Sequence, residues 1–271
     1  MASNTLAAEG LHLSGNKPAW QDADRWMFVF MAGLFLLIVL TGFIPSSIGK
    51  IAAVQSGERA PFLTVLHVHA FLMGTWILLL LTQASLVATK HGAIHQRLGM
   101  SSMVLMPAMV ATGFLLVPAN FGLVWGLDPS NVPSEVIAQR KEIISNIALA
   151  QIRTGILFPI IVSLALYFRK KDLGTHKRLM ILATVIPIPA ALDRISWLPN
   201  TMPFNPIAPN LYVLLLIFPL FAYDLLRHRT IPRAYMIWGA VWAPSAIVVY
   251  MLWGSSWWLS IAPKIMGVES W

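Results

Sequence analysis

Four of the seven histidines stand at the two ends of one apolar segment. His67 and His69 begin the stretch HVHAFLMGTWILLLLTQASLVATKHGAIHQRL, and His91 and His95 lie near its end. An imidazole ring is a ligand for haem iron and other metals, and it exchanges protons near neutral pH. We therefore expect the ends of this segment to bind a ligand or to carry protons.

The spacing of these histidines limits the metal sites that they can form. His67 and His69 point about 200° apart around a helix, so only one of them can face a single small centre. His91 and His95 are four residues apart, but Gly92 interrupts the helix between them and the motif contains no glutamate. A hydrolytic zinc site of the H-E-x-x-H type is excluded on this basis, and the sequence assigns no particular metal.

The composition places these histidines in an integral membrane protein. Hydrophobic residues make up 57% of the chain and charged residues 11%, whereas about 25% of a soluble domain is charged. The chain has no cysteine, which excludes disulfides, iron–sulfur clusters and thiolate ligands. The net charge of +8 comes mainly from short loops between apolar segments, so it predicts topology and argues against a nucleic-acid partner.

The apolar segments predict an all-α, polytopic bundle with the lipid bilayer as its partner. A spanning helix needs about 20 apolar residues, and residues 1–271 form a single membrane domain in which Pro187 and Pro189 predict a kink. Seven spans are expected, at roughly 26–45, 62–88, 98–118, 144–168, 179–198, 211–226 and 236–261.

The distribution of basic residues predicts the orientation of the bundle. Twelve of the nineteen Lys and Arg residues, Lys17 among them, fall on the side of the N-terminus, and five fall on the other side. Cytoplasmic loops carry the excess of positive charge. The N-terminus is therefore predicted to be cytoplasmic, and seven spans place the C-terminus outside.

A short motif occurs twice, at two predicted junctions between a loop and a helix. IHQRL at 94–98 aligns with THKRL at 175–179 when the sequence is shifted by 81 residues. The match predicts that spans two and three repeat as spans four and five, in parallel two-helix hairpins. The alternative is that any short cytoplasmic loop tends to collect His, Lys and Arg.

The repeated motif gives the first candidate site. His95 and His176 would occupy equivalent positions at the starts of two helices, where neutral histidines followed by snorkelling Arg97 and Arg178 form a purely structural arrangement. The functional alternative has the two histidines facing each other across a local two-fold axis. That arrangement suits a bis-histidine haem b, with Arg97 and Arg178 near its propionates.

A second candidate site lies toward the outer side. Ionisable groups inside a span are costly, and they normally face the interior of the bundle or a water-filled cavity. Five such groups fall at similar depth and predict an outward-opening polar pocket, with an Arg–Asp pair and two hydrogen-bonded histidines as the structural alternative. They are His67, His69, Arg153, Asp193 and Arg194.

Four segments carry a resemblance that covers about residues 65–235. HVHAFLMGTW, HQRLG, HKRLM and YDLLRHR resemble uncharacterised bacterial multi-pass membrane proteins with an H-x-R-L-G signature, which are loosely similar to the cytochrome b561-like membrane haem proteins. The resemblance implies a haem-bearing bundle that handles electrons in the bacterial inner membrane.

Two classes of function follow from the sequence. The first is a redox membrane protein that binds haem b or quinone, alone or with partner subunits of an electron-transfer complex. The second is a non-enzymatic membrane protein, either a small transporter or an accessory subunit. The sequence leaves open whether the chain is an enzyme.

Overall fold

Every regular element that the structure describes is a helix, which confirms the all-α fold. The computed structural model describes residues 19–269, so Lys17 lies outside the described part of the chain. In chain order the helices are α1 (Ala19–Gln55), α2 (Thr64–Ala88), α3 (Gly92–Gly99), α4 (Ser102–Trp125), α5 (Ser134–Phe168), α6 (Leu173–Thr184), α7 (Pro189–Leu192), α8 (Ile207–His228), α9 (Arg233–Leu252) and α10 (Ser256–Ile265).

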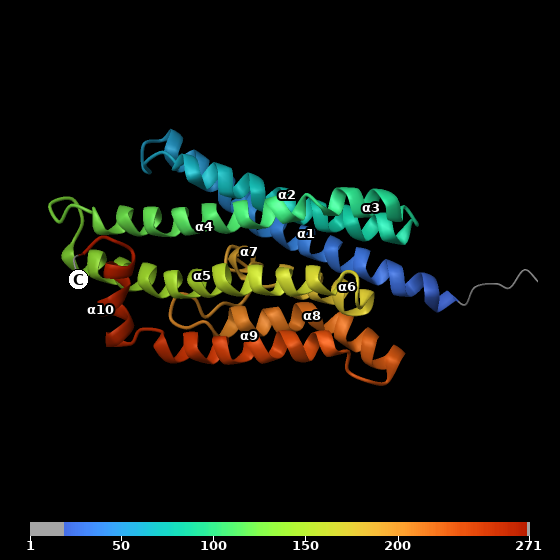
Figure 1. Cartoon of the computed structure of the whole chain (residues 1–271). Helices are drawn as coiled ribbons and strands as arrows, with labels where there is room; N and C mark the ends of the chain where they lie inside the picture. The colour runs from blue at the N-terminus through green and yellow to red at the C-terminus, as the bar shows by residue number, and fades with distance from the viewer. Residues whose placement is uncertain (1–18, 270–271) are drawn as a thin grey trace, which may run out of the picture.

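Long apolar helices make this a membrane-embedded protein. Six helical segments of the described chain are long and apolar enough to cross a membrane: Ala23–Gln55, Thr64–Ala88, Gly92–Trp125, Ser134–Phe168, Ile207–His228 and Arg233–Leu252. Figure 1 shows them running together along the long axis of one bundle. Each satisfies its backbone hydrogen bonds largely within itself, which the interior of a bilayer requires.

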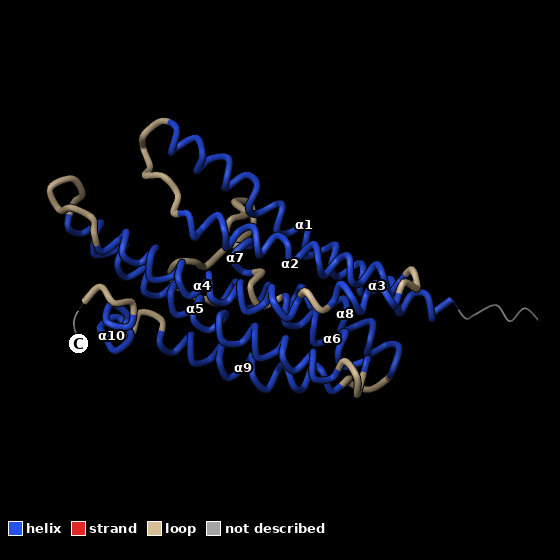
Figure 2. Tube along the Cα trace, turned by 45° about the horizontal axis from the view of Figure 1, so that its top comes forward, coloured by secondary structure: helices blue, strands red, loops and turns tan. Residues whose placement is uncertain are grey.

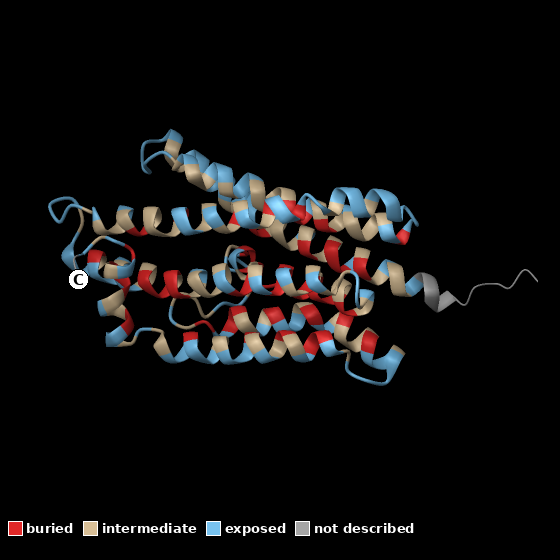
Figure 3. Cartoon of the chain, viewed as in Figure 1, coloured by how far each residue is buried: buried red, intermediate tan, exposed pale blue. Residues whose placement is uncertain are grey.

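The outside of the bundle is apolar, as contact with lipid demands. Buried residues gather between the helices, and exposed residues cover the outer faces (Figure 3). Phe71, Val104 and Leu226 are examples of large apolar side chains that point outward. An apolar surface of this extent is a liability in water, but it is the expected lining against lipid tails.

The two ends of the bundle differ in their elements. We call the end that carries α3, the start of α6 and the α8–α9 turn the basic end, and the end that carries α10 the opposite end (Figure 1). At the opposite end the α1–α2 loop projects away from the α4–α5 loop in both views (Figure 1, Figure 2). The basic end is predicted to be cytoplasmic, and that orientation stays a prediction.

The predicted fifth span, 179–198, is not one continuous helix. Helix α6 ends at Thr184, and α7 is only four residues long. Pro187 and Pro189 lack the backbone N–H groups that would continue the helix, so the predicted kink becomes a complete break. The segment is nevertheless packed in the core, and Leu179, Leu182 and Val185 are among its fully buried residues.

A close contact with α1 holds the broken segment in place. A Cβ atom added to Gly42 of α1 would lie 2.1 Å from the carbonyl oxygen of Ala191 in α7. Only glycine allows the two backbones to approach this closely. On another side, the indole Nε1 of Trp76 donates to the hydroxyl of Thr184, 3.1 Å away, at the end of α6.

The prediction of a last span at 236–261 is wrong at its C-terminal end. Helix α9 stops at Leu252, and the chain turns at Gly254, whose φ of 70° favours glycine. The Ser255 hydroxyl then accepts a hydrogen bond from the backbone N–H of Trp258 and begins α10. The indole Nε1 of Trp258 donates to the Ser145 carbonyl, so α10 packs against the first turns of α5.

The other predicted spans correspond to helices whose bounds differ. Helix α1 continues ten residues beyond the predicted end at 45, passing Pro45, and α5 begins ten residues before the predicted start at 144. Both extensions are more polar than the predicted spans, so an apolar window alone misses them. The predicted repeat also stays a prediction, since the first motif lies on the short α3 and the second on α6.

Candidate functional site

Arg178 forms a buried ion pair instead of facing a cofactor. Its Nε donates to Oδ2 of Asp224 at 2.7 Å, and its Nη2 donates to Oδ1 at 2.5 Å, which is the bidentate geometry that suits guanidinium and carboxylate. Only 8% of the Arg178 side chain and 1% of the Asp224 side chain are exposed. The pair therefore joins α6 to α8 inside the bundle.

Further hydrogen bonds satisfy both members of this pair. The Tyr235 hydroxyl of α9 donates to Oδ2 of Asp224 at 2.7 Å, and Nη1 of Arg178 donates to the Gly174 carbonyl at 2.9 Å. Nε2 of His228 lies 3.2 Å from Nη2 of Arg178. A buried charge pair with this many partners is a structural connection between helices.

Arg97, the equivalent residue of the first motif, is in a different environment. Its side chain is exposed on α3, whereas Arg178 is buried on α6. The two motifs therefore share residue types but place their arginines differently.

Each histidine of the repeated motif contacts the helix that precedes it. Nδ1 of His176 donates to the Ala165 carbonyl of α5 at 2.8 Å, which leaves a free lone pair on Nε2. Near His95, the Gln83 amide is assigned the orientation that satisfies all its partners: its nitrogen donates to Nδ1 and to the carbonyl of His95. Nε2 of neutral His95 therefore carries the proton.

The structure brings these two histidines into one neighbourhood at the basic end. His176 interacts electrostatically with His95 and with Arg169. Arg169 itself reaches across to the junction of α3 and α4, where its Nη1 lies 3.8 Å from the sulfur atoms of Met100 and Met103. The predicted proximity of His95 and His176 thus has structural support, although no hydrogen bond joins the two rings.

The residues at this place do not fit the predicted bis-histidine haem. His176 has the arrangement of a ligating histidine, with its second nitrogen held by a carbonyl. His95 does not, because Gln83 occupies its lone-pair nitrogen, and Arg178 would have to leave Asp224 to reach a propionate. Within residues 19–269, no group of three or more His, Asp or Glu side chains that could hold a metal ion comes together.

The predicted outer histidines lie apart from the other members of their pocket. Nδ1 of His69 is 3.0 Å from the Thr112 hydroxyl of α4, and that hydroxyl donates to the Ala108 carbonyl. A hydroxyl has one proton, so His69 is the donor in this contact. His67 is exposed and packs edge-on against Phe62.

Asp193 and Arg194 form a third, separate group near α1. The Arg194 guanidinium lies 4.6 Å from the ring centroid of Phe43 and donates to the Ala190 carbonyl. The amide of Asn200 donates to Asp193 at 3.3 Å. These contacts of Asp193 and Arg194 do not include Arg153, and the shared outer pocket stays a prediction.

Arg153 is half-buried between helices, and its hydrogen-bond partners are all neutral. Its Nε donates to the Ser245 hydroxyl at 2.9 Å, its Nη1 to Oδ1 of Asn210 at 3.0 Å, and its Nη2 to the Trp242 carbonyl at 3.0 Å. The guanidinium also lies 5.3 Å from the centroid of the Trp242 ring. Helices α5, α8 and α9 all contribute to this site.

No carboxylate of the described residues forms an ion pair with Arg153. Among the described residues, none of the ion pairs within 4.0 Å involves this side chain. Arg153 lies about 22 Å from the end of α5 at Phe168 by the rise of 1.5 Å per residue. A hydrocarbon core that began at Phe168 and was about 30 Å thick would place this cation about 8 Å inside the opposite boundary, where charge still costs free energy.

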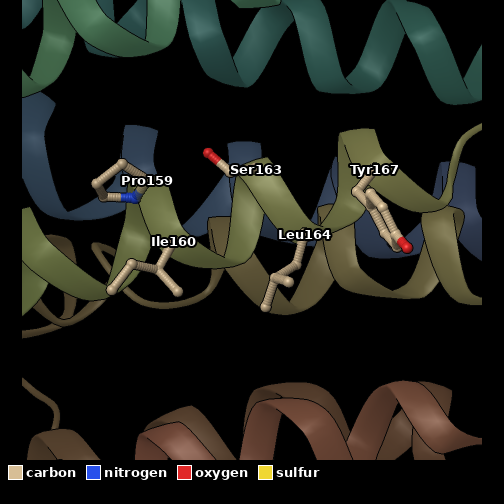
Figure 4. Close-up of a pocket in the computed structure, with 5 residues that line it drawn as sticks. All are labelled: Pro159, Ile160, Ser163, Leu164 and Tyr167. Carbon is tan, nitrogen blue, oxygen red and sulfur yellow. The ribbon is translucent and has the colours of Figure 1, made fainter.

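Two apolar grooves lie on the faces of the helices that carry Arg153 and its partners. The larger, about 520 Å³, is lined only by α5, through Pro159, Ile160, Ser163, Leu164 and Tyr167 (Figure 4). Ile160 follows Arg153 by seven residues, which places it on the same side of α5 two turns away. The smaller groove, about 240 Å³, lies between α8 and α9 and includes Asn210 in its wall.

Sequence reasoning identified Arg153 but missed its partners. Asn210, Ser245 and Trp242 follow it by 57 to 92 residues, and no local pattern links them. Asn210 could have been noticed in the sequence, because it is a polar residue in the first turn of an apolar helix.

Comparisons with known proteins identify no relative. The chain matches no protein-family model, and no curated protein or solved structure is similar to it by the comparisons made. The resemblance to b561-like proteins therefore stays a prediction, and a function can be inferred only from the geometry of the site.

Proposed function

We propose that the chain is an integral membrane protein that binds a carboxylate-bearing molecule within the bilayer, at Arg153. The observation that carries this proposal is a guanidinium inside the bundle whose protein partners are all neutral. Arginine stays protonated in proteins, so the site is a fixed positive charge. An anionic ligand would supply the counter-charge that the chain does not.

The donors that remain on Arg153 suit a carboxylate. A guanidinium has five N–H donors, and three of them are used by Ser245, Asn210 and Trp242. Two N–H groups are left, one on each Nη atom, and a carboxylate accepts hydrogen bonds from two donors in a fork. The three protein contacts hold the guanidinium in position, so little side-chain entropy is lost when a ligand binds.

The break between α6 and α7 supports a binding or carrier role. Discontinuous helices near the middle of the membrane are a recurrent feature of transporter binding sites, and Figure 1 places α7 midway along the bundle. This proposal belongs to the non-enzymatic class of membrane protein, a small transporter or a binding subunit.

Titration with a short carboxylate tests the proposal. Purified protein in detergent is titrated with carbon-13-labelled butyrate, and the carboxyl resonance is followed by NMR. We expect saturable binding that weakens roughly tenfold or more in Arg153→Gln, a loss of about 1.4 kcal/mol or more. The matched control is Arg97→Gln, which removes an exposed arginine and should bind butyrate as the parent does. Equal binding by all three proteins would overturn the proposal.

The predicted redox role is a second proposal, favoured by the free Nε2 of His176. Quinone binding, or haem b binding through His176 without His95 as the second ligand, would serve the electron-transfer function predicted from the sequence, with partner subunits and the bacterial inner membrane as its setting. Absorbance of the purified protein distinguishes the two proposals. A Soret band that shifts with dithionite supports a haem, and carboxylate binding by a colourless protein favours the Arg153 site.

A further inference from the structure

The groove between α8 and α9 is in direct contact with the Arg153 site. Its wall contains Asn210, Leu211 and Leu214 from α8, and Ala246, Ile247 and Tyr250 from α9. Asn210 accepts a hydrogen bond from Arg153, and Ser245, which also accepts from Arg153, precedes Ala246 in the chain. One groove thus combines an apolar wall with a polar end that adjoins a half-buried cation.

The apolar wall of this groove faces the lipid side of the bundle. Leu211, Ile247 and Tyr250 are exposed at the surface of the helices. A ligand from the bilayer can therefore reach the polar end without passing through water. The volume of about 240 Å³ is smaller than the roughly 300–1,000 Å³ of enclosed small-molecule pockets, so the groove takes part of a chain and leaves the rest in lipid.

The position of Arg153 between helices selects among anionic amphiphiles. Phospholipid head groups are bulky and stay at the interface, outside a hydrocarbon core about 30 Å thick, whereas Arg153 is half-buried among α5, α8 and α9. A single-chain acid has a small head group that fits between two helices. Its carboxylate also matches the two N–H donors that Arg153 has left.

We propose that the ligand of Arg153 is a long-chain carboxylate, the anion of a fatty acid, whose chain lies in the α8–α9 groove. This inference rests on the proposed function, because it takes carboxylate binding at Arg153 as given and names the molecule. The carboxylate contacts Arg153 beside Asn210, and the chain runs between Leu214 and Ala246. Entry is lateral, from the bilayer.

The groove on α5 provides an internal comparison. It is larger and is also exposed to lipid, but none of its five lining residues contacts Arg153 or its three partners through a hydrogen bond. A chain bound merely because a groove is apolar would occupy the α5 groove as well. A chain held by its carboxylate at Arg153 would occupy the α8–α9 groove.

Photo-crosslinking in nanodiscs tests the location of the chain. The probe is palmitate with a diazirine at mid-chain, the control probe is its methyl ester, and labelled residues are identified by mass spectrometry. We expect labelling within 207–214 and 246–250. The methyl ester and the Arg153→Gln variant should each reduce this labelling about tenfold, since both remove the charge-assisted contact.

Two groove-filling variants complete the experiment. Ala246→Phe fills the α8–α9 groove and should abolish the labelling, whereas Ser163→Phe fills the α5 groove and should leave it unchanged.

Labelling spread evenly over the lipid-facing helices, or labelling that is equal for the methyl ester, would overturn the inference. If butyrate still bound to Arg153 in that case, the proposed function would stand without the chain; if butyrate binding were also independent of Arg153, both would fall.

Discussion

Two arginines lie within the same bundle, and their surroundings are opposite. Arg178 donates two hydrogen bonds to the carboxylate of Asp224, which also accepts from Tyr235. Arg153 donates only to a hydroxyl, an amide oxygen and a backbone carbonyl. The first charge is neutralised by the chain, and the second is not.

This difference separates a structural charge from a functional one. Breaking a buried pair leaves an uncompensated charge, so Arg178 and Asp224 depend on each other for stability. A cation without a counter-charge costs free energy in the membrane, and a bound anion would offset that cost. The comparison therefore gives Arg178 a role in α6–α8 packing and is the reason that ligand binding is proposed for Arg153.

The largest expected effect comes from breaking the pair. Asp224→Asn keeps the size of the side chain but leaves Arg178 buried without its counter-charge, and it should lower the free energy of unfolding by about 3–5 kcal/mol. Thermal unfolding in detergent, followed by circular dichroism, measures the loss. The double variant Arg178→Met, Asp224→Leu removes both charges and should recover much of it. A stable Asp224→Asn protein would show that the pair does not hold α6 to α8.

The sequence predicted much of the fold because membrane helices follow from composition alone. Runs of apolar residues located six helices, and the bilayer leaves few alternatives to a helix. The break after Thr184 was harder to predict, because the residues around it are as apolar as those of a spanning helix. Gly254 and Ser255 ended α9 through turn chemistry that a hydropathy window does not detect.

The candidate sites were predicted less well because contacts between helices leave little trace in sequence. Arg153, Asp193 and Arg194 were expected at one depth, yet depth does not say which helices are neighbours. The repeated motif places Arg178 beside a cofactor, because its actual partner, Asp224, lies 46 residues away and leaves no signal near it. The same motif predicts that His95 and His176 face each other, and that site stays a prediction.

The contact between Gly42 of α1 and Ala191 of α7 tests the role of the broken segment that begins on α6, the helix of Arg178. Its packing should affect stability but not ligand binding at Arg153. Gly42→Ala would bring a methyl group to 2.1 Å from the Ala191 carbonyl, and overpacking of this kind typically costs about 1–3 kcal/mol. Gly33→Ala is the matched control, because a Cβ there meets nothing within 4 Å. We expect a lower unfolding temperature for Gly42→Ala alone, with butyrate binding retained by the folded fraction. Equal stability of the two variants would contradict the tight packing of α7 on α1.

A smaller effect concerns the start of α6, the helix that carries Arg178. The Thr175 hydroxyl and backbone N–H donate to Asp172, and these contacts, together with the nearby Arg233, hold the pKa of Asp172 below its ordinary value of 3.8. A lowered pKa stabilises the fold fully above pH 3.8, and this contribution is lost as the pH falls through the folded-state pKa.

Asp172→Ala removes the cap and should cost about 1 kcal/mol at pH 7. The difference from the parent should shrink as the pH is lowered below 3.8, because the parent then loses its carboxylate as well. Denaturant unfolding at several pH values measures this difference. A gap that is constant down to the lowest pH would show that the charge of Asp172 does not contribute.

The smallest expected change in stability is at Arg153, and it is the most informative. Arg153→Met removes three hydrogen bonds but also removes a buried charge that no carboxylate balances. These two effects oppose each other, so the free energy of unfolding should change by no more than about 1 kcal/mol. Arg178→Met, the same substitution at the paired site, leaves Asp224 buried and alone and should cost several times more.

Unfolding of the two variants side by side, with butyrate binding measured on both, separates the roles. Arg153→Met should keep its stability and lose the ligand. If Arg153→Met unfolded as readily as Arg178→Met, the neutral contacts of Arg153 would be structural, and the distinction between the two arginines would fail.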